Sequence, residues 1–350
     1  MLIDKSSYED FISCHEHNEK KRCPFCGNLT TKKHGFIYSR ILTNRGRVKR
    51  KTQRYLCKKC GRTFTYFGTK TRKRTSDSLK KRAVLDFVLS KNSLREVGKR
   101  YEVSPTTILN WLPTISSRMK VYDICESRCS GVIQLDGKEI KLNGKKKSIF
   151  LSIDANTKQP LTYQICNGEN KKTAKDFLLS LKQTYPSRVR GIISDFGRGK
   201  CFLGVVNKVF PQVPHQVCLV HFERYVWMFL PRTKRSEFYL RNSLLKSLIN
   251  KVIKAPSRKE SLDWLNKLNH FKPFFRASYH NRFIRSINKN YEYLTKYFDY
   301  DYLITNTNRI ENMIRQLNRK LKNLDGFKSE KNLAHFMKIW FNGYYEKYKN

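Results

Sequence analysis

The chain has 350 residues, of which 72 are Lys or Arg and 28 are Asp or Glu, so its formal net charge is +44. A folded monomer with this charge repels itself, and the usual reason to carry it is a polyanionic partner, most often nucleic acid. The charge argues against a small-molecule metabolic enzyme. The 39% hydrophobic and 13% aromatic content argues against a disordered basic tail protein. The length fits two or three domains.

The positive charge is spread along the whole chain. Residues 1–122 carry 29 Lys and Arg against 9 Asp and Glu, and a net charge of +24 lies beyond them. We therefore expect both halves to contact nucleic acid, although solvated Lys-rich faces would account for part of the second half.

Membrane spans and disulfides find no support in the sequence. No stretch approaches the roughly 18 to 20 apolar residues of a membrane span, and the first ten residues lack an apolar signal region. We therefore expect a cytoplasmic protein with no membrane partner. Four of the ten cysteines form two C-x-x-C pairs, which favours reduced thiolates that bind metal. The other six, which show no disulfide-framework spacing, are Cys14, Cys125, Cys129, Cys166, Cys201 and Cys218.

The two cysteine pairs, Cys23 to Cys26 and Cys57 to Cys60, are each followed directly by a glycine. Four thiolates can close a tetrahedral zinc site, and glycine permits the tight turn after each pair. Residues 35–44 and 47–56 between them resemble two strands, so the sequence predicts a zinc ribbon over residues 1–70. Two alternatives to a zinc site are that the two C-x-x-C pairs occur together by chance, or that they form a redox-active dithiol. The side chains expected to meet DNA phosphates are Lys49, Arg50, Lys51 and Arg54.

Helical spacing of apolar residues begins at Ser76. Ser93 can cap a second helix, and Pro105 opens a third at its first position. Two short helices joined by a three-residue turn predict a helix-turn-helix DNA-binding domain over residues 71–122. The residues expected to face the DNA groove are Thr106, Thr107 and Asn110, whereas Ile108 and Trp111 fit the core. A purely structural helical hairpin is the alternative.

Strand patterns follow Gly131. Residues 132–142, 146–157 and 160–169 predict three antiparallel strands, residues 172–185 an amphipathic helix, and residues 188–197 a buried fourth strand. This order is expected of a ribonuclease H-like α/β core, whose first part is residues 130–222. The predicted fold class is therefore multidomain α/β, with a small zinc ribbon, a helix-turn-helix and a ribonuclease H-like core interrupted by an all-α insertion domain.

The helical insertion is expected over residues 223–304, because this stretch is too long for a loop. Residues 305–350 then form the C-terminal helices of the core. Aromatic and basic residues alternate in the insertion and would stack on distorted DNA ends or, more commonly, pack its helices together. They are Tyr225, Trp227, Phe229, Arg232, Lys234, Arg235, Phe274, Phe275, Arg276 and Tyr279.

Two carboxylates lie among apolar residues of the predicted strands. Asp136 lies within the first strand and Asp195 ends the fourth. Burying a carboxylate there costs several kcal/mol unless a cation or hydrogen bonds compensate. Phosphoryl transfer on DNA uses two divalent cations about 3.5 to 4 Å apart with carboxylate ligands. Both acids are therefore predicted metal ligands, whereas Asp154, at a turn, is expected to make local hydrogen bonds.

A third carboxylate has to come from a distant segment. Residues 304–324 carry a helical apolar stripe, and Glu311 lies at its edge near the helix start, with Thr307 as the expected cap. Glu311 would then face the sheet. The alternative is an ordinary ion pair with Arg315 on a solvated helix. The stripe consists of Ile310, Ile314, Leu317, Leu321 and Leu324.

Four short motifs in order resemble the Mutator-like DDE transposases of prokaryotic insertion sequences. They are L-D-G at 135–137, I-S-D-F-G at 193–197, C-L-V-H at 218–221 and T-N-T-N-R-I-E at 305–311. The resemblance covers about residues 20–345, and the ribbon and helix-turn-helix are similar to those of related transposases. It implies that Asp136, Asp195 and Glu311 bind Mg²⁺ or Mn²⁺ and that Cys218 and His221 are the C-x-x-H pair of the catalytic site. His221 would bind a metal-bound phosphate or orient the DNA strand.

Considered alone, Cys218 and His221 are better explained as a buried cysteine and a hydrogen-bonded histidine, because a lone C-x-x-H offers zinc only two ligands, and His215 is a weaker candidate for a role.

The resemblance implies a DDE-type transposase that binds the terminal inverted repeats of an insertion sequence and cleaves and joins DNA. It implies Mg²⁺ or Mn²⁺ as cofactor with structural Zn²⁺, double-stranded element-end and target DNA as partners, and a homodimer that holds two ends, nucleoid-associated in a prokaryote. One alternative is a domesticated DNA-binding regulator with an inactive core. Another is a structure-selective nuclease without strand transfer.

Overall fold

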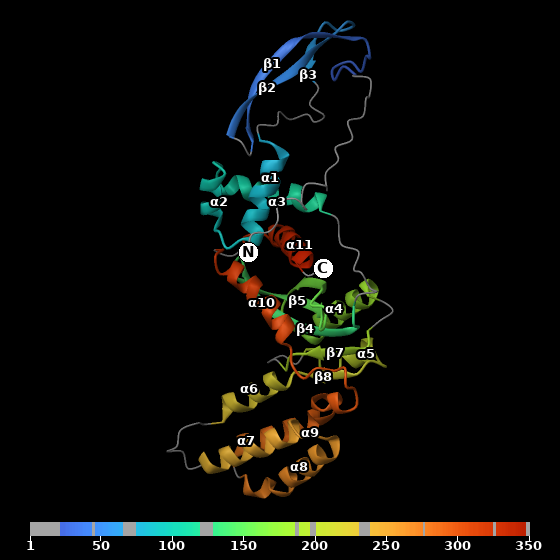
Figure 1. Cartoon of the computed structure of the whole chain (residues 1–350), viewed down its shortest axis with the longest axis vertical. Coiled ribbons are helices and arrows are strands. Elements are labelled where there is room, and N and C mark those ends of the chain that lie inside the picture. Colours follow the sequence, from blue (N-terminus) through green and yellow to red (C-terminus); the bar gives the residue numbers. More distant parts are fainter. Residues whose placement is uncertain are drawn as a thin grey trace. The chain divides into compact units, whose positions relative to one another are not determined.

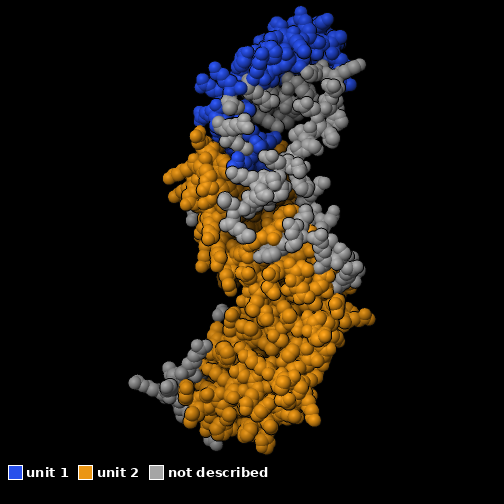
Figure 2. Space-filling view, viewed as in Figure 1, with its two compact units in different colours: residues 1–82 blue, residues 83–350 orange. Residues whose placement is uncertain are grey.

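The computed structural model describes residues 22–43, 46–65, 75–119, 129–185, 189–196, 201–230, 239–275, 277–324 and 327–347. The chain divides into two compact units, residues 1–82 and 83–350 (Figure 2). Several residues considered above lie outside the described ranges: Cys14, Cys125, Arg232, Lys234, Arg235 and Arg276.

The first unit contains a three-stranded antiparallel sheet in the order β1-β2-β3. Its strands are β1 (Thr31–Thr43), β2 (Gly46–Cys57) and β3 (Thr63–Thr65). The two predicted strands are confirmed, whereas β3 was not predicted because three residues are too few to show a period. Tyr55 and Phe64 stack at 5.9 Å between ring centroids and, with Cys23 and Cys57, form a small core.

Three helices follow: α1 (Asp77–Leu89), α2 (Leu94–Arg100) and α3 (Pro105–Arg118). Ser93 caps α2 in a capping box with Glu96, and Pro105 stands in the first turn of α3, both as predicted. Helix α3 continues past Pro113 to Arg118. Proline removes one helical hydrogen bond there, and the burial of Ile115 on the far side compensates for that loss.

The second unit is built on a five-stranded sheet in the order β6-β5-β4-β7-β8 (Figure 1). Its strands are β4 (Val132–Leu142), β5 (Lys145–Asp154), β6 (Pro160–Cys166), β7 (Gly191–Ser194) and β8 (His215–Val217), and two helices lie between them in sequence, α4 (Lys171–Thr184) and α5 (Val206–Val209). The first three strands are antiparallel, and β7 runs parallel to β4 and to β8. The predicted meander, helix and fourth strand are confirmed. Strand β8 was missed, since its three residues lie in a longer apolar run.

The described residues between β8 and Glu311 contain helices and no strand, as predicted. They form α6 (Leu219–Phe229), α7 (Tyr239–Ile253), α8 (Arg258–His270), η2 (Lys272–Phe274), α9 (Ser278–Leu294) and η3 (Lys296–Phe298). Phe275 is buried, and the Tyr225 ring packs against Phe196, Phe222 and Phe283. These aromatics therefore stabilise the helices, while Phe274 is half exposed beside Arg241.

The last helices, α10 (Asn308–Leu321) and α11 (Glu330–Lys347), share one hydrophobic core with β5 and with residues 83–115. Gly343 of α11 lies so close to Leu89 of α1 that an added Cβ would meet Leu89 Cδ2 at 2.3 Å. At the end of α10, Lys320 Nζ donates to Asn92 O at 2.7 Å. Helices α2 and α3 are thus part of the core of the second unit. Among the described residues, no helix has the length and apolar character required to cross a membrane.

Candidate functional site

The pairing of β4 with β7 brings the first two acids together. Leu135 of β4 is the partner of Ser194 of β7 in a parallel register. Asp136 directly follows Leu135, and Asp195 directly follows Ser194. They therefore occupy neighbouring positions in the middle of the sheet, where β7 ends.

Glu311 reaches the same place through a buried glutamine. Gln134 is fully buried and, two residues before Asp136, lies on the same face of β4. The backbone N–H of Ile310 donates to Gln134 Oε1 at 2.9 Å, and Gln134 Nε2 donates to Asn306 O at 2.9 Å. These bonds fix the first turn of α10 on the sheet. Sequence analysis missed Gln134, although a polar residue inside the run V-I-Q-L-D was a signal.

His221 lies between the acids. Its Nδ1 is 3.2 Å from Asp195 Oδ1, and its Nε2 is 3.6 Å from Glu311 Oε1. Thr307 Oγ1 donates to Glu311 Oε1 at 3.1 Å and lies 3.2 Å from His221 Nδ1. Thr307 occupies the N-cap position of α10, but it makes no side-chain capping bond. Thr307 is thus the N-cap residue, as predicted, but its hydroxyl group contacts Glu311 and His221 instead of a backbone N–H.

Glu311 faces the site rather than solvent. Its side chain is 20% exposed, and its ion-pair partners among the described residues are His221 and Arg224, the latter at 3.9 Å. Arg315, the alternative partner considered from the sequence, is not among them. The interpretation of Glu311 as a sheet-facing acid is thus the one that the geometry favours.

Burial governs the electrostatics of the site. It raises the pKa of Asp136 to about 8, with help from the charge of Asp195, and it also raises the pKa of Asp195. For His221, burial alone would lower the pKa. The hydrogen bond with Cys218 and the charges of Asp195 and Glu311 outweigh burial and raise it to about 9. The carboxylates are therefore only partly compensated by the surrounding protein.

The residues of this site fit a divalent cation. Asp195 Oδ1 is buried and accepts no hydrogen bond within the part of the chain that the structure describes. Carboxylate oxygens are the ligands that Mg²⁺ and Mn²⁺ prefer. A cation held by Asp136, Asp195 and Glu311 would supply the missing compensation.

Gly137, the glycine of the L-D-G motif, occupies a position with little room for a side chain. Its N–H donates to Asp136 Oδ1 at 2.7 Å, and an added Cβ would lie 2.8 Å from Glu169 Oε1 and 3.1 Å from Phe150 Cε1. Burial, followed by the charge of Asp195, raises the pKa of Glu169. Glu169 is thus a fourth acid beside the site. Sequence analysis missed it, and its loop between β6 and α4 carries no signal for it.

The four paired cysteines converge in the first unit. Their sulfurs lie within 4.8 Å of one another, with 3.6 Å between Cys23 Sγ and Cys60 Sγ and between Cys26 Sγ and Cys57 Sγ. A tetrahedral zinc site with Zn–S bonds of about 2.3 Å separates its sulfurs by about 3.8 Å. Gly27 and Gly61 have φ of 71° and 68°, so only glycine suits these turns without strain. The cluster is consistent with zinc.

Most of the predicted DNA-contacting side chains are accessible. Lys49 and Lys51 are exposed on β2, whereas Arg54 is half-buried and donates to Thr63 Oγ1 at 2.8 Å. The side chain of Arg50 lies outside the described structure. Thr106 and Asn110 are exposed on α3, and the N–H of Thr107 donates to the cap residue Ser104.

The residues expected to be structural are so placed. Ile108 is fully buried, and Trp111 packs against the core. Asp154 is buried and accepts hydrogen bonds from Ser130, Gly131, Asn156 and Thr157. His215 is buried with Nε2 2.8 Å from Ser194 Oγ, and burial lowers its pKa to about 3.

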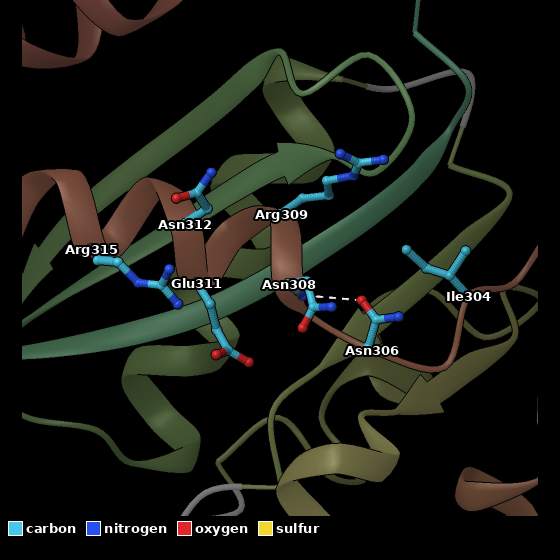
Figure 3. A pocket seen from close by; sticks show the side chains of 7 residues that line it. All are labelled: Ile304, Asn306, Asn308, Arg309, Glu311, Asn312 and Arg315. Atoms are coloured by element: carbon cyan, nitrogen blue, oxygen red, sulfur yellow. Dashed lines mark hydrogen bonds between the residues drawn. The ribbon is translucent and has the colours of Figure 1, made fainter. Parts of the chain in front are cut away.

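An open cavity of about 690 Å³ adjoins Glu311 at the start of α10 (Figure 3). In Figure 3 the side chains of Glu311 and Arg309 leave the helix in opposite directions, and Asn306 Oδ1 accepts a hydrogen bond from the N–H of Asn308. The lining residues are Ile304, Asn306, Asn308, Arg309, Glu311, Asn312 and Arg315. A polar cavity with two arginines beside an acid suits an anionic ligand held next to a metal site.

Comparison with known proteins places the chain among transposases. The family model described as "Transposase, Mutator family" matches residues 128–341, and the chain belongs to this family. The predicted resemblance is confirmed. The chain is also 23% identical over 366 residues to the "Insertion element ISM1 uncharacterized 48.3 kDa protein" of Methanobrevibacter smithii, covering 93% of this chain and 83% of that protein.

Similarity to solved structures is more distant. The intasome of simian T-cell lymphotropic virus in complex with the PP2A regulatory subunit B56 gamma aligns with a TM-score of 0.23 and 13% identity, over 57% of this chain and 62% of that chain. The catalytic domain of Mos1 mariner transposase aligns with a TM-score of 0.21 and 16% identity, over 65% and 97%. The Mos1 mariner paired end complex with Mn aligns with a TM-score of 0.20 and 17% identity, over 67% and 81%.

Proposed function

We propose that this protein is a DDE-type transposase that binds the terminal inverted repeats of an insertion sequence and catalyses metal-dependent DNA cleavage and strand transfer. The observation that carries the proposal is the meeting of Asp136, Asp195 and Glu311. They come from two adjacent strands and a helix more than a hundred residues later, and His221 contacts both Asp195 and Glu311. A purely structural role would not require three acids around a buried, partly uncompensated position.

Each part of the chain has a proposed task. The sheet of the second unit is a ribonuclease H-like core, as its strand order β6-β5-β4-β7-β8 supports. The first unit contains a zinc ribbon, and α2 and α3 form a helix-turn-helix. The ribbon and the helix-turn-helix together recognise the element end. The helices α6 to α9 are an all-α insertion. A homodimer holds the two ends, because both have to be cut and joined.

Mg²⁺ or Mn²⁺, when bound, would lower the pKa of an attacking hydroxyl and stabilise the leaving oxygen. The protein's own residues have separate tasks. Asp136, Asp195 and Glu311 would hold the metal, and Thr307 fixes the Glu311 carboxylate by its hydrogen bond. Arg224, which pairs with Glu311 at 3.9 Å and is 61% exposed, would meet a DNA phosphate at the edge of the site.

The test uses the full chain, a supercoiled plasmid with element ends, and Mg²⁺. Asp136→Asn, Asp195→Asn and Glu311→Gln should each abolish cleavage and strand transfer and leave end binding near that of the wild type. The matched control is Asp176→Asn on the exposed side of α4, which should stay active. Asp154→Asn is unsuitable as a control, because Asp154 accepts six hydrogen bonds in the core.

The outcomes separate the alternatives. End binding by a wild type that never cleaves would favour a DNA-binding regulator with an inactive core. Cleavage without any joined product would favour a nuclease. Cleavage that survives in all three acid variants would refute the proposed site.

A further inference from the structure

A second set of metal-binding side chains meets at Glu311. Cys218 is the residue before α6, and His221 lies in the first turn of that helix, so the i,i+3 spacing turns both to one side. One ligand atom each of Cys218, His221 and Glu311 lies within 4.8 Å of the other two. Cys218 is fully buried, whereas His221 and Glu311 are 19% and 20% exposed. The set is closed on the cysteine side and open on the other.

The donor atoms of this set differ from those of the carboxylate site. A thiolate and an imidazole are ligands for Zn²⁺ and other late transition metals, whereas Mg²⁺ prefers carboxylate oxygens. His221 Nδ1 faces Asp195 and Thr307. Its Nε2, 3.6 Å from Glu311 Oε1, is therefore the nitrogen turned toward Glu311.

The spacing is close to that of a real zinc site. Metal–ligand bonds of about 2.0 to 2.3 Å at tetrahedral angles separate ligand atoms by about 3.5 Å. His221 Nε2 and Glu311 Oε1 are already 3.6 Å apart, and a separation at the 4.8 Å bound would need a movement of about 1 Å, which side-chain rotation of Glu311 can supply. Three protein ligands leave a fourth position for water or a phosphate oxygen.

We infer that Cys218, His221 and Glu311 form a transition-metal site that takes Zn²⁺ and shares Glu311 with the carboxylate site. Glu311 cannot serve both metals in full. Binding of Zn²⁺ withdraws it from Asp136 and Asp195, so zinc acts as an inhibitor of a Mg²⁺-dependent reaction. The existence of the metal site is independent of the proposed function, whereas the inhibition rests on it.

The binding test uses the full-length protein with zinc already bound to the four paired cysteines, titrated with Co²⁺. One further equivalent of Co²⁺ should bind and give a thiolate-to-Co²⁺ charge-transfer absorption. Cys218→Ser should lose this absorption, and so should His221→Gln, which guards against a folding defect in the buried variant. The matched control is Cys201→Ser, which removes another buried thiol and should keep the signal.

Exchange of Co²⁺ into the paired-cysteine cluster is excluded by the same two variants. Cys218→Ser and His221→Gln leave that cluster intact, so a signal from exchange would persist in both. Absence of the signal in the wild type, or its persistence in both Cys218→Ser and His221→Gln, would overturn the metal site.

The inhibition test adds a small excess of Zn²⁺ over protein while Mg²⁺ stays saturating. Strand transfer by the wild type and by Cys201→Ser should slow by about tenfold or more, because Glu311 no longer supports the Mg²⁺ site. An unchanged rate would overturn the inhibition. A cobalt signal in a protein that never cleaves DNA would leave the metal site standing and count against the proposed function. Cleavage of DNA by a protein that gives no cobalt signal would overturn the metal site and leave the proposed function standing.

Discussion

The side chain of Gln134 accepts a hydrogen bond at 2.9 Å from the backbone of Ile310, the residue directly before Glu311. Its amide nitrogen holds Asn306 O in the same way. One buried side chain of the sheet thus positions the start of the helix that carries the third acid. The position of Glu311 in the candidate site therefore depends on Gln134, which is not itself a proposed metal ligand.

Gln134→Leu tests this dependence. It removes both hydrogen bonds and leaves two backbone groups without their partner, at a cost of about 1 to 3 kcal/mol for each group in the free energy of unfolding. Because the first turn of α10 is then free to shift, strand transfer should fall far more than stability. Urea unfolding and the plasmid assay measure the two effects.

The control for Gln134→Leu is a glutamine with the same kind of role elsewhere. Gln216 of β8 is fully buried, donates to Leu294 O at 3.1 Å and accepts from Tyr297 N at 3.0 Å. Gln216→Leu should lose similar stability yet keep its activity at a temperature where it is folded. Equal activity losses in the two variants would contradict a positioning role for Gln134.

Zinc in the first unit should be removable without unfolding the second. Cys57 is fully buried and close to the other three thiols, so Cys57→Ser should lose the structural zinc, because three ligands bind it far less tightly. All four tryptophans lie beyond residue 82, so their fluorescence reports the second unit alone.

Metal analysis should find one zinc fewer per chain in Cys57→Ser, with an unchanged tryptophan unfolding curve and lost end binding. Cys166→Ser, which removes a buried thiol outside the cluster, is the control and should keep the zinc. Full zinc content in Cys57→Ser would speak against the four-cysteine zinc site.

His215 should make the second unit sensitive to acid. Its pKa is about 3 in the folded protein, because it is buried, against 6.5 for an ordinary histidine. Below pH 6.5 the unfolded chain binds a proton that the folded chain does not, so this contribution to stability falls by about 1.4 kcal/mol per pH unit toward pH 3. Above pH 6.5 both states are neutral, and the contribution is constant.

The measurement is tryptophan-detected urea unfolding between pH 4 and 8 for the wild type and His215→Gln. The glutamine variant cannot take up this proton, so its stability should decrease less steeply below pH 6.5. Parallel curves would mean that His215 is not buried in its neutral form.

The contact between Gly343 and Leu89 predicts that Gly343→Ala changes the free energy of unfolding in opposite directions in the wild type and in a Leu89→Ala variant. A Cβ at Gly343 would meet the end of the Leu89 side chain at 2.3 Å, so Gly343→Ala should be neutral or destabilising in the wild type. In a Leu89→Ala background the clash is gone, and the same change should stabilise α11 by about 1 kcal/mol, the helix preference of alanine over glycine. A double-mutant cycle of unfolding free energies measures this. The same effect in both backgrounds would show that α1 and α11 do not touch there.

The sequence predicted those elements whose pattern is local. Strand β4 was expected over its observed bounds because its residues alternate, and Ser93 and Pro105 mark helix starts by their own chemistry. The elements β3 and β8 were missed, because three residues show no period. Helix α3 continues through Pro113, because the burial of Ile115 outweighs the hydrogen bond that proline removes.

The candidate site was predicted in part for the same reason. Asp136, Asp195 and Glu311 were predicted as candidate ligands because apolar residues surround them in the sequence and because the four short motifs occur in the order seen in the family. Gln134, Glu169 and the true partners of Thr307 were not, since their roles arise from contacts between segments far apart in the sequence. Of these residues only Gln134 has a local signal, because it is a polar residue inside an apolar run.

The shared core of α1 to α3 with α10 and α11 limits how this protein can exchange parts with its relatives during evolution. The first unit has its own core of Cys23, Tyr55, Cys57 and Phe64, so recombination that replaces this core leaves the residues of the shared core unchanged. Helices α1 to α3 cannot be replaced in this way. Leu89 at the end of α1 lies against Gly343 of α11, and Asn92 O accepts a hydrogen bond from Lys320 of α10. If these helices read the element end, as proposed, a new specificity has to arise on their outer surface by point mutation, or together with matching C-terminal helices.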